Sequence, residues 1–262
     1  MFLLVVLAVV GGAVPATAAP ATLPVRPLTV LSFNIHHAAG LDGVFDLDRL
    51  AREIRATRAD VIGLQEVDKF YGERSGWTDE PAELASRLGM HVVYGANLDI
   101  EPPAAGQPRR QYGTAILSRY PIVDWRNTLL PKGNPAEEQR GLLEAVVNVR
   151  GLKVRAMTTH LQHDNANSRL QQANVVAEAV AASREPVVLT GDLNAPPTAP
   201  EVTAITAHLR DNGDANTYPA EAPTARIDYV LTDGLPVASR VLPTEASDHR
   251  PVLAALVVWR AR

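Results

Sequence analysis

Several polar side chains that can carry out chemistry lie where apolar runs of this sequence end. Each one alone is typical of a turn, a helix cap or a solvated surface. As a set they indicate more, because strand ends in a layered α/β protein present side chains rigidly into one cleft. The residues are Asn34, Glu66, His160, Asp192, Asn194, Asp228, Asp248 and His249.

The donor atoms in this set indicate a hard metal ion. Glu66, Asp248 and Asn34 offer oxygen atoms of the kind that bind Mg²⁺, Mn²⁺ or Ca²⁺. The histidines lack the close helical spacing of a zinc motif, and a histidine beside an aspartate, such as His249, suits a general base better. Mg²⁺ commonly keeps water and substrate phosphate among its ligands. The pattern therefore predicts Mg²⁺-dependent phosphoryl transfer, with Mn²⁺ or Ca²⁺ as alternatives.

Other hydrolytic and phosphoryl-transfer machinery is missing from the sequence. It contains neither a Gly-x-Ser-x-Gly elbow nor a Gly-x-x-x-x-Gly-Lys loop, which argues against a serine hydrolase and a P-loop enzyme. It also contains no cysteine, so disulfides, thiolate metal sites and a cysteine nucleophile are excluded.

Apolar periodicity predicts the scaffold that positions these residues. Helices are expected at 46–57, with Asp46 as cap, and at 81–88, 168–183 and 200–209. The polar stretch 97–110 is expected to be a loop. Several strands form hairpins, so two mixed sheets packed face to face with helices outside would fit. The expected strands are 28–33, 61–64, 91–94, 114–117, 122–130, 142–149, 153–159, 187–190, 227–231, 238–242 and 252–258.

Composition favours one globular domain and lacks the excess of basic residues that is typical of nucleic-acid-binding proteins. The chain has 262 residues, 46% of them hydrophobic, and shows no linker or internal repeat. The net charge is −4 and the pI about 6.0, whereas a tight nucleic-acid binder usually carries a basic excess. An enzyme that only visits nucleic acid is still compatible, because a bound cation can supply local positive charge.

The first residues have the pattern of a secretory signal peptide. Phe2 to Val10 is an apolar run too short for a permanent membrane anchor, and Ala16-Thr17-Ala18 supplies a small-x-small cleavage pattern. We therefore expect a signal peptide at 1–19, a domain at 20–262 and a secreted protein.

Seven segments, in order, resemble motifs of the endonuclease/exonuclease/phosphatase superfamily, which includes secreted deoxyribonuclease, abasic-site endonucleases, bacterial sphingomyelinases and inositol-phosphate phosphatases. The resemblance implies a four-layer α/β sandwich, two mixed β-sheets flanked by helices, in a secreted bacterial member. It also implies in-line attack of water on phosphorus. The segments are Ser32–Ile35, Gln65–Val67, Tyr112–Ser118, Thr159–Leu161, Gly191–Asn194, Arg226–Tyr229 and Ser247–Pro251.

The resemblance also implies roles for the metal ligands and the base. Glu66 corresponds to the principal metal ligand, with Asn34 and Asp248 nearby. His249 corresponds to the base that takes a proton from the attacking water, and Asp228 would hold its ring in the useful tautomer.

Further residues are implied as contacts to the phosphoryl group or the nucleophile. Asp192 would position or deprotonate the nucleophile. Asn194 and His160 would donate hydrogen bonds to phosphoryl oxygens, or His160 would instead protonate the leaving oxygen. Tyr112 is a further phosphate contact. Arg74 and Arg140 are interpreted either as phosphate clamps or as surface charges.

Three functions compete at this point. The leading hypothesis is a phosphodiesterase or phosphatase acting on a small or lipid-linked substrate, by resemblance to a bacterial branch related to lipid-anchor metabolism. The first alternative is a secreted nuclease, and the second is an inactive binding module on the same fold. We expect a monomer without an obligate protein partner, and transient membrane contact through Trp77 or Trp125 is a further hypothesis.

Overall fold

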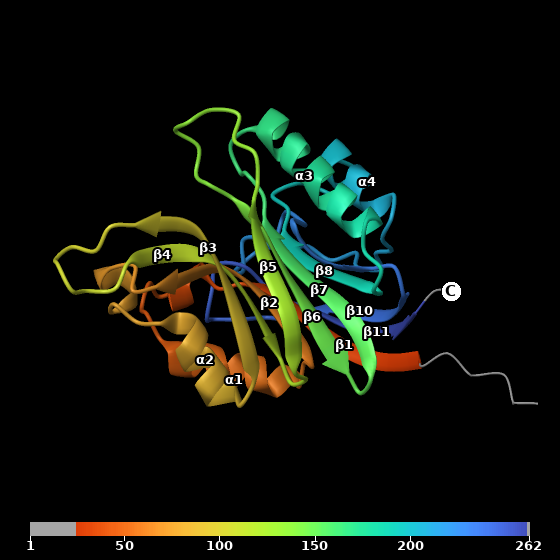
Figure 1. Ribbon diagram of the computed structural model, residues 1–262, viewed down its shortest axis with the longest axis horizontal. Helices are drawn as coiled ribbons and strands as arrows, with labels where there is room; N and C mark the ends of the chain where they lie inside the picture. The colour runs from red at the N-terminus through yellow and green to blue at the C-terminus, as the bar shows by residue number, and fades with distance from the viewer. Residues whose placement is uncertain (1–24, 261–262) are drawn as a thin grey trace, which may run out of the picture.

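The computed structural model describes residues 25–260, which form four layers (Figure 1). Two β-sheets pack face to face in the middle. The helices α1 (Leu47–Thr57) and α2 (Glu80–Leu88) cover one outer face, and α3 (Ala166–Ala181) and α4 (Pro200–Thr206) cover the other. The expected four-layer sandwich of two mixed sheets flanked by helices is confirmed.

The first sheet has six strands in the order β10-β11-β1-β2-β4-β3. Its two central strands, β1 and β2, are parallel, and every other pairing is antiparallel. The strands are β1 (Val25–Asn34), β2 (Val61–Lys69), β3 (His91–Ile100), β4 (Arg110–Ser118), β10 (Leu235–Val241) and β11 (Val252–Trp259).

The second sheet has five strands in the order β5-β6-β7-β8-β9. Here β7 and β8 are parallel and the remaining pairs are antiparallel. The strands are β5 (Ile122–Leu129), β6 (Gly141–Val149), β7 (Leu152–His160), β8 (Val187–Asp192) and β9 (Asp228–Thr232).

Three hydrophobic clusters separate the four layers. On β1, Leu28 and Val30 point to the other sheet, whereas Leu31 and Phe33 pack under α1 and α2. A third cluster joins α3 and α4 to the second sheet. Because the central strands are buried on both faces, they read in the sequence as nearly continuous apolar runs. Gly63 allows close contact between the sheets, since a Cβ there would lie 1.8 Å from Oγ1 of Thr190.

Two expectations about element boundaries need correction. Strand β3 continues to Ile100, so the expected loop at 97–110 is shorter than predicted. Glu66 does not end a strand: β2 runs on to Lys69 through a break in register between Leu64 and Val67. Asp46 caps α1 as expected, because its side chain accepts a hydrogen bond from the backbone N–H of Arg49.

The signal peptide expected at 1–19 lies outside the described residues. Within residues 25–260, no helix has the length and apolar character needed to cross a membrane.

Candidate active site

The predicted site residues gather at one edge of the two sheets. Asn34, His160 and Asp192 are the last residues of β1, β7 and β8. The expectation that Asp228 and His249 also follow strands is wrong, because they precede or begin β9 and β11. These strands run antiparallel to β8 and β1, so their first residues reach the same edge.

A pocket of about 420 Å³ opens at this edge. All the predicted site residues line it except Asn34 and Asp228, whose side chains are buried. Five further side chains contribute to its walls, namely Tyr71, Glu138, His163, Tyr218 and Ile227.

His249, which lines the pocket, is paired with the buried Asp228. Nδ1 of His249 lies 3.0 and 3.2 Å from the two carboxylate oxygens of Asp228, and both side chains are buried. The ring of Tyr218 packs 4.6 Å from the imidazole, centroid to centroid. A carboxylate hydrogen-bonded to Nδ1 fixes the orientation of the ring and leaves Nε2 as the nitrogen that can exchange a proton in the pocket.

Asp192 lies between the two imidazoles of the site. Its Oδ2 is 3.4 Å from Nε2 of His160 and 3.8 Å from Nε2 of His249. The same oxygen accepts a hydrogen bond of 3.1 Å from Nδ2 of Asn34, and Oδ1 accepts one of 2.9 Å from the backbone N–H of Asn194. Asp192 therefore connects the pair of His249 and Asp228 with His160. These four buried residues are called the floor of the pocket.

The buried carboxylates shift the protonation of the floor. Burial, followed by the charge of Asp228, raises the pKa of Asp192 to about 7. Burial lowers the pKa of His249, but the adjacent Asp228 and then Asp192 outweigh it and raise that pKa to about 10. The imidazolium is thus stabilised by anions, and a cation bound nearby would oppose this effect.

His160 is held as a neutral ring. Arg140, which has only donor N–H groups, places Nη1 3.0 Å from Nδ1 of His160, so Nδ1 accepts and the proton sits on Nε2. Burial first, and then the charge of Arg140, lower the pKa of His160 well below its ordinary value. The geometry therefore favours the donor role for His160 over the role of acid, two alternatives that the resemblance leaves open.

Glu66 reaches the pocket because of a β-bulge. The backbone of Glu66 is left-handed, with φ of 57°, at the register break opposite β4. Its neighbour Gln65 points inward and donates to Oγ1 of Thr158 at 2.9 Å, while the bulge turns Glu66 outward. Bulges commonly re-aim a side chain in this way beside active sites.

Asn34 holds the two carboxylates of the site together. Its amide nitrogen donates to Oε1 of Glu66 at 2.9 Å as well as to Asp192, and its oxygen accepts from the backbone N–H of His36. Ser247 in turn donates to the backbone carbonyl of Asn34 at 2.7 Å. In this arrangement Asn34 positions Glu66 while its own oxygen accepts a hydrogen bond from the backbone, and its role as a metal ligand stays a prediction.

The two predicted arginines line the pocket in different ways. Arg140 is only 3% exposed and contacts Glu138 at 2.6 Å in addition to His160. Arg74 is partly exposed, makes two hydrogen bonds to the buried carboxylate of Asp68, and stacks 4.2 Å from the ring of Tyr71. Neither arginine is an isolated surface charge, and their role as phosphate clamps stays a prediction.

Tyr112 keeps its phenolic proton. Burial, and then the charge of Glu66, raise its pKa well above the ordinary value. A buried hydroxyl on the pocket wall can therefore donate a hydrogen bond to an anionic group.

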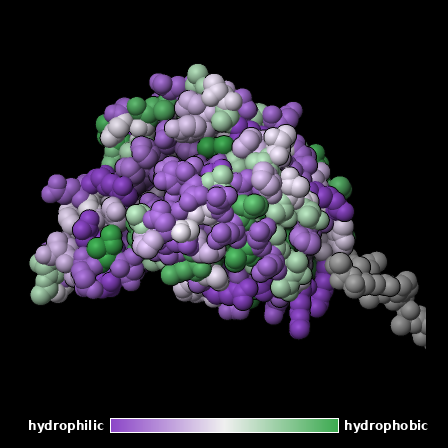
Figure 2. Space-filling model, turned by 90° about the horizontal axis from the view of Figure 1, so that it is seen from above, coloured by the Kyte–Doolittle hydropathy of each residue, from purple (hydrophilic) through white to green (hydrophobic). Residues whose placement is uncertain are grey.

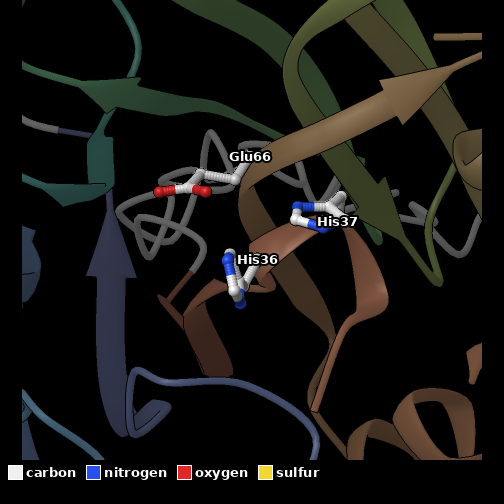
Figure 3. A group of neighbouring side chains, drawn as sticks. All are labelled: His36, His37 and Glu66. Carbon is white, nitrogen blue, oxygen red and sulfur yellow. The ribbon is translucent and has the colours of Figure 1, made fainter. Parts of the chain in front are cut away.

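Sequence reasoning missed two sets of residues around the pocket. Tyr71, Glu138 and Tyr218 lie in loops, where their side chains could not be assigned a direction. His36 and His37 form a close group with Glu66 (Figure 3). Two consecutive histidines two residues after Asn34 were a usable signal for this group.

A divalent metal fits the carboxylates at the pocket edge. Glu66 and Asp248 are both half-buried, line the pocket and carry hard oxygens. A second close group, Asp192, Asp228 and His249, is already bonded within itself. Glu66 and Asp248 are therefore the better candidates to hold an ion.

Comparison with known proteins agrees with this architecture. The uncharacterized protein YbhP of Escherichia coli K12 is 28% identical over 250 residues, covering 87% of this chain and 95% of that protein. The protein cwh43 of Schizosaccharomyces pombe is 29% identical over 147 residues, which are 55% of this chain and 14% of that protein.

Solved structures show the same fold. An endonuclease/exonuclease/phosphatase from Beutenbergia cavernae is 30% identical, with a TM-score of 0.75 over 88% of this chain and 71% of that one. The mannosyl-6-phosphatase Bt3783 of Bacteroides thetaiotaomicron is 20% identical, with a TM-score of 0.72 over 88% of this chain and 100% of that one. At that identity it shows the fold alone.

A sequence profile covers most of the chain as well. The profile of the Endonuclease/Exonuclease/phosphatase family matches residues 31–249, from β1 to the histidine of the pocket floor. This chain belongs to the Endonuclease/Exonuclease/phosphatase family, whose members hydrolyse phosphate esters.

Proposed function

We propose that this chain is a secreted, metal-dependent phosphodiesterase or phosphatase that acts on a small or lipid-linked substrate. The observation that carries the proposal is the continuous row of contacts Asp228–His249–Asp192–His160–Arg140 along the floor of one pocket. This row combines a base held by a carboxylate with fixed hydrogen-bond donors, which is what hydrolysis at phosphorus requires.

His249 and Asp192 would act on the attacking water. Asp228 occupies Nδ1 of His249, so Nε2 is the atom that would accept the proton of the water, once a cation bound nearby has lowered the raised pKa of the ring and Nε2 has lost its own proton. Oδ2 of Asp192, 3.8 Å from that nitrogen, would orient the water toward phosphorus. Both groups are fixed by buried hydrogen bonds, which lowers the cost of reorganisation during the reaction.

The opposite side of the pocket would bind the phosphoryl oxygens. The Nε2–H of neutral His160, 3.4 Å from Oδ2 of Asp192, and the hydroxyl of Tyr112 are donors on residues that line the cavity. The side-chain amide of Asn194 is oriented by its bond to the carbonyl of Leu161 at 3.0 Å. Arg140 adds a positive charge directly behind His160. These donors would stabilise the negative charge that spreads over the phosphoryl oxygens.

Glu66 and Asp248 would hold a divalent ion, with Mg²⁺ expected and Mn²⁺ or Ca²⁺ as alternatives. When bound, the ion would supply Lewis-acid charge at a phosphoryl oxygen. Family enzymes typically use divalent metals, which supports this part of the proposal.

The size and charge of the surroundings favour a compact phosphate ester over a long nucleic acid. The pocket encloses about 420 Å³, and the chain has a net charge of −4. Arg109, from the sequence's one Arg-Arg pair, is already paired with Asp99 and Glu101. A nuclease is the second candidate, because the family whose profile matches residues 31–249 is named for endonucleases and exonucleases as well as phosphatases.

Contact with a membrane surface, a monomeric state and export remain separate proposals. Trp77 and Trp125 are 40% and 52% exposed, and either ring would suit a lipid interface. The face in Figure 2 is largely hydrophilic, with hydrophobic residues in small, separate groups. Co-sedimentation with phosphatidylcholine vesicles would test the membrane contact. Sedimentation velocity would test the monomeric state, and cell fractionation would test export.

A substrate panel tests the proposal. Purified protein with Mg²⁺ or Mn²⁺ should cleave bis-p-nitrophenyl phosphate and at least one glycerophosphodiester, sphingolipid or sugar phosphate faster than plasmid DNA. Faster cleavage of DNA would favour the nuclease. Absence of turnover on every substrate, in protein with an intact fold, would favour the binding module.

A further inference from the structure

We propose that His36 and His37, together with Glu66, form a mixed imidazole and carboxylate site that selects a first-row transition metal such as Zn²⁺ over Mg²⁺ or Ca²⁺. The inference rests on the proposed function, because Glu66 is the carboxylate assigned there to the metal. It goes further by naming two nitrogen ligands, and it replaces the Mg²⁺ expected there by a transition metal, the class to which the alternative Mn²⁺ belongs.

The three side chains converge closely enough to share one ion. One ligand atom from each lies within 4.8 Å of the others. Figure 3 shows how the three side chains lie. Two atoms bound to one tetrahedral Zn²⁺, each at about 2.0–2.2 Å, lie about 3.3–3.6 Å apart. Side-chain rotations that bring the atoms up to roughly 1.5 Å closer would close the site. The two rings are 4.5 Å apart, centroid to centroid, at 69°, so they pack edge to face.

An unusual backbone holds the two histidines in place. His36, His37 and Ala38 all adopt left-handed φ, at 44°, 43° and 56°. Successive left-handed residues with side chains are rare and cost free energy, and such strain commonly occurs at functional sites. The turn is fastened by two backbone hydrogen bonds of 2.8 Å, from Ala38 to Ile35 and from Ala39 to His36. It directly follows Asn34, which holds Glu66.

The ring of His36 carries an unsatisfied nitrogen that faces an acceptor. Among residues 25–260, its buried Nδ1 has no hydrogen-bond partner. It lies 3.8 Å from Oδ1 of Asp248, beyond hydrogen-bonding distance but close enough for both atoms to approach one ion. Leaving a buried ring nitrogen without a partner is costly, and an ion at this position would remove that cost.

The charges and donor types favour a transition metal. Imidazole nitrogen suits Zn²⁺ and similar ions, whereas Mg²⁺ and Ca²⁺ prefer oxygen throughout. The nearest cation, Arg74, is engaged by two hydrogen bonds from its guanidinium to Asp68. Glu66 and Asp248 supply the negative charge that a divalent ion requires. Three protein ligands leave positions free for water and substrate, as in catalytic zinc sites.

Metal binding by the full chain tests the inference without relying on turnover. Chelator-treated protein is titrated by calorimetry with Zn²⁺ alone, with and without excess Mg²⁺. We expect one Zn²⁺ per chain that excess Mg²⁺ does not displace. His36→Asn and His37→Asn suit the comparison, because asparagine tolerates left-handed backbone. Each should weaken Zn²⁺ binding by at least the roughly 10- to 100-fold that loss of an outer-shell partner costs. His208→Asn, at an exposed histidine, is the matched control and should bind as wild type.

X-ray absorption of the Zn²⁺-loaded wild-type protein gives a second readout that needs no variant. It should show imidazole scattering from two ligands, and its absence would overturn the inference. So would unchanged Zn²⁺ affinity in the His36→Asn/His37→Asn double variant. If that double variant keeps its metal while Glu66→Gln loses it, this inference fails and the proposed metal at Glu66 stands. Full turnover in chelator would instead contradict the metal in the proposed function.

Discussion

The floor and the rim of the pocket are built in opposite ways. The floor, defined by Asp192, Asp228, His160 and His249, is buried, and each of its side chains has a partner within the protein. The rim, defined by Glu66 and Asp248, which line the pocket, and by His36 and His37 beside Glu66, is half-exposed. The difference indicates that the floor is preorganised for chemistry, and it supports the proposal that a bound ion completes the rim.

The rim also contains polar side chains that approach each other without forming a hydrogen bond. His36 and Asp248 approach at 3.8 Å without a hydrogen bond, and both side chains are 39% exposed. Asn34 connects the two regions, because its amide contacts Glu66 of the rim and Asp192 of the floor. An ion at the rim would therefore influence the floor through one buried side chain.

The largest effect should come from removing the base of the floor. His249→Ala should lower kcat by roughly 10²–10⁴-fold, the usual contribution of a general base, and should leave the fold intact. The measurement is the rate on bis-p-nitrophenyl phosphate, with circular dichroism as the check on folding. His208→Ala is the matched control. Activity near wild type in His249→Ala would remove this residue from the mechanism.

Removing the ion should abolish activity while leaving the floor in place. Treatment with EDTA should reduce turnover to background, and an added divalent ion should restore it: Mg²⁺ or Mn²⁺ under the proposed function, and Zn²⁺ if His36 and His37 also bind the ion. The melting temperature should rise with the concentration of added metal, because an ion that binds only the folded state stabilises it. Full activity in the chelator would show that the rim does not need a metal.

Substitution of Arg140 tests how much its contact with His160 contributes to the reaction. Arg140→Lys should lower kcat/KM by about 10- to 100-fold, as expected for losing one hydrogen bond to a charged group. A lysine cannot contact His160 and Glu138 with the same fork of donors. Kinetics on the best substrate would measure the loss. A variant with unchanged kcat/KM would show that His160 needs no support from this side.

The pH dependence of stability should report the charge of the floor. The pKa of His249 is raised to about 10, so its contribution is full below its ordinary pKa and is lost as the pH rises through about 10. In metal-free protein the free energy of unfolding should therefore fall between about pH 7 and 10, by about 1.4 kcal/mol per unit at most. Asp228→Asn should flatten this slope. Equal slopes in urea titrations of both proteins would contradict the assignment.

The smallest effect should come from a site remote from both regions. Asp46→Ala removes the cap of α1 and should cost about 1 kcal/mol of stability without changing kcat. Urea denaturation and a rate assay measure the two quantities. A change in kcat would mean that the outer helix layer is coupled to the pocket.

The sequence predicts the scaffold well, because its signals are local. The helix after Asp46 has both a cap and an apolar face, and β8 is a buried run that stops at Asp192. The meeting of strand ends at one edge follows from the layered fold. The resemblance supplied the roles, since composition and periodicity identify donors but do not say which proton moves.

Features that depend on long-range packing are not visible in the sequence. The bulge that turns Glu66 outward depends on pairing with β4, and the left-handed turn at His36 and His37 has no glycine to mark it. Arg140 follows a polar loop and looks like a surface charge, yet it is buried behind His160. In each case the tertiary contacts decide the side-chain direction.

Whether rim and floor act in a single step can be measured directly with a double-mutant cycle. The rates of Glu66→Gln, His249→Ala and the double variant are compared on bis-p-nitrophenyl phosphate with saturating metal. Residues that act as a unit are strongly non-additive. We predict that the double variant is within a few-fold of the slower single variant. A double variant whose loss equals the product of the two single losses would show that rim and floor act independently.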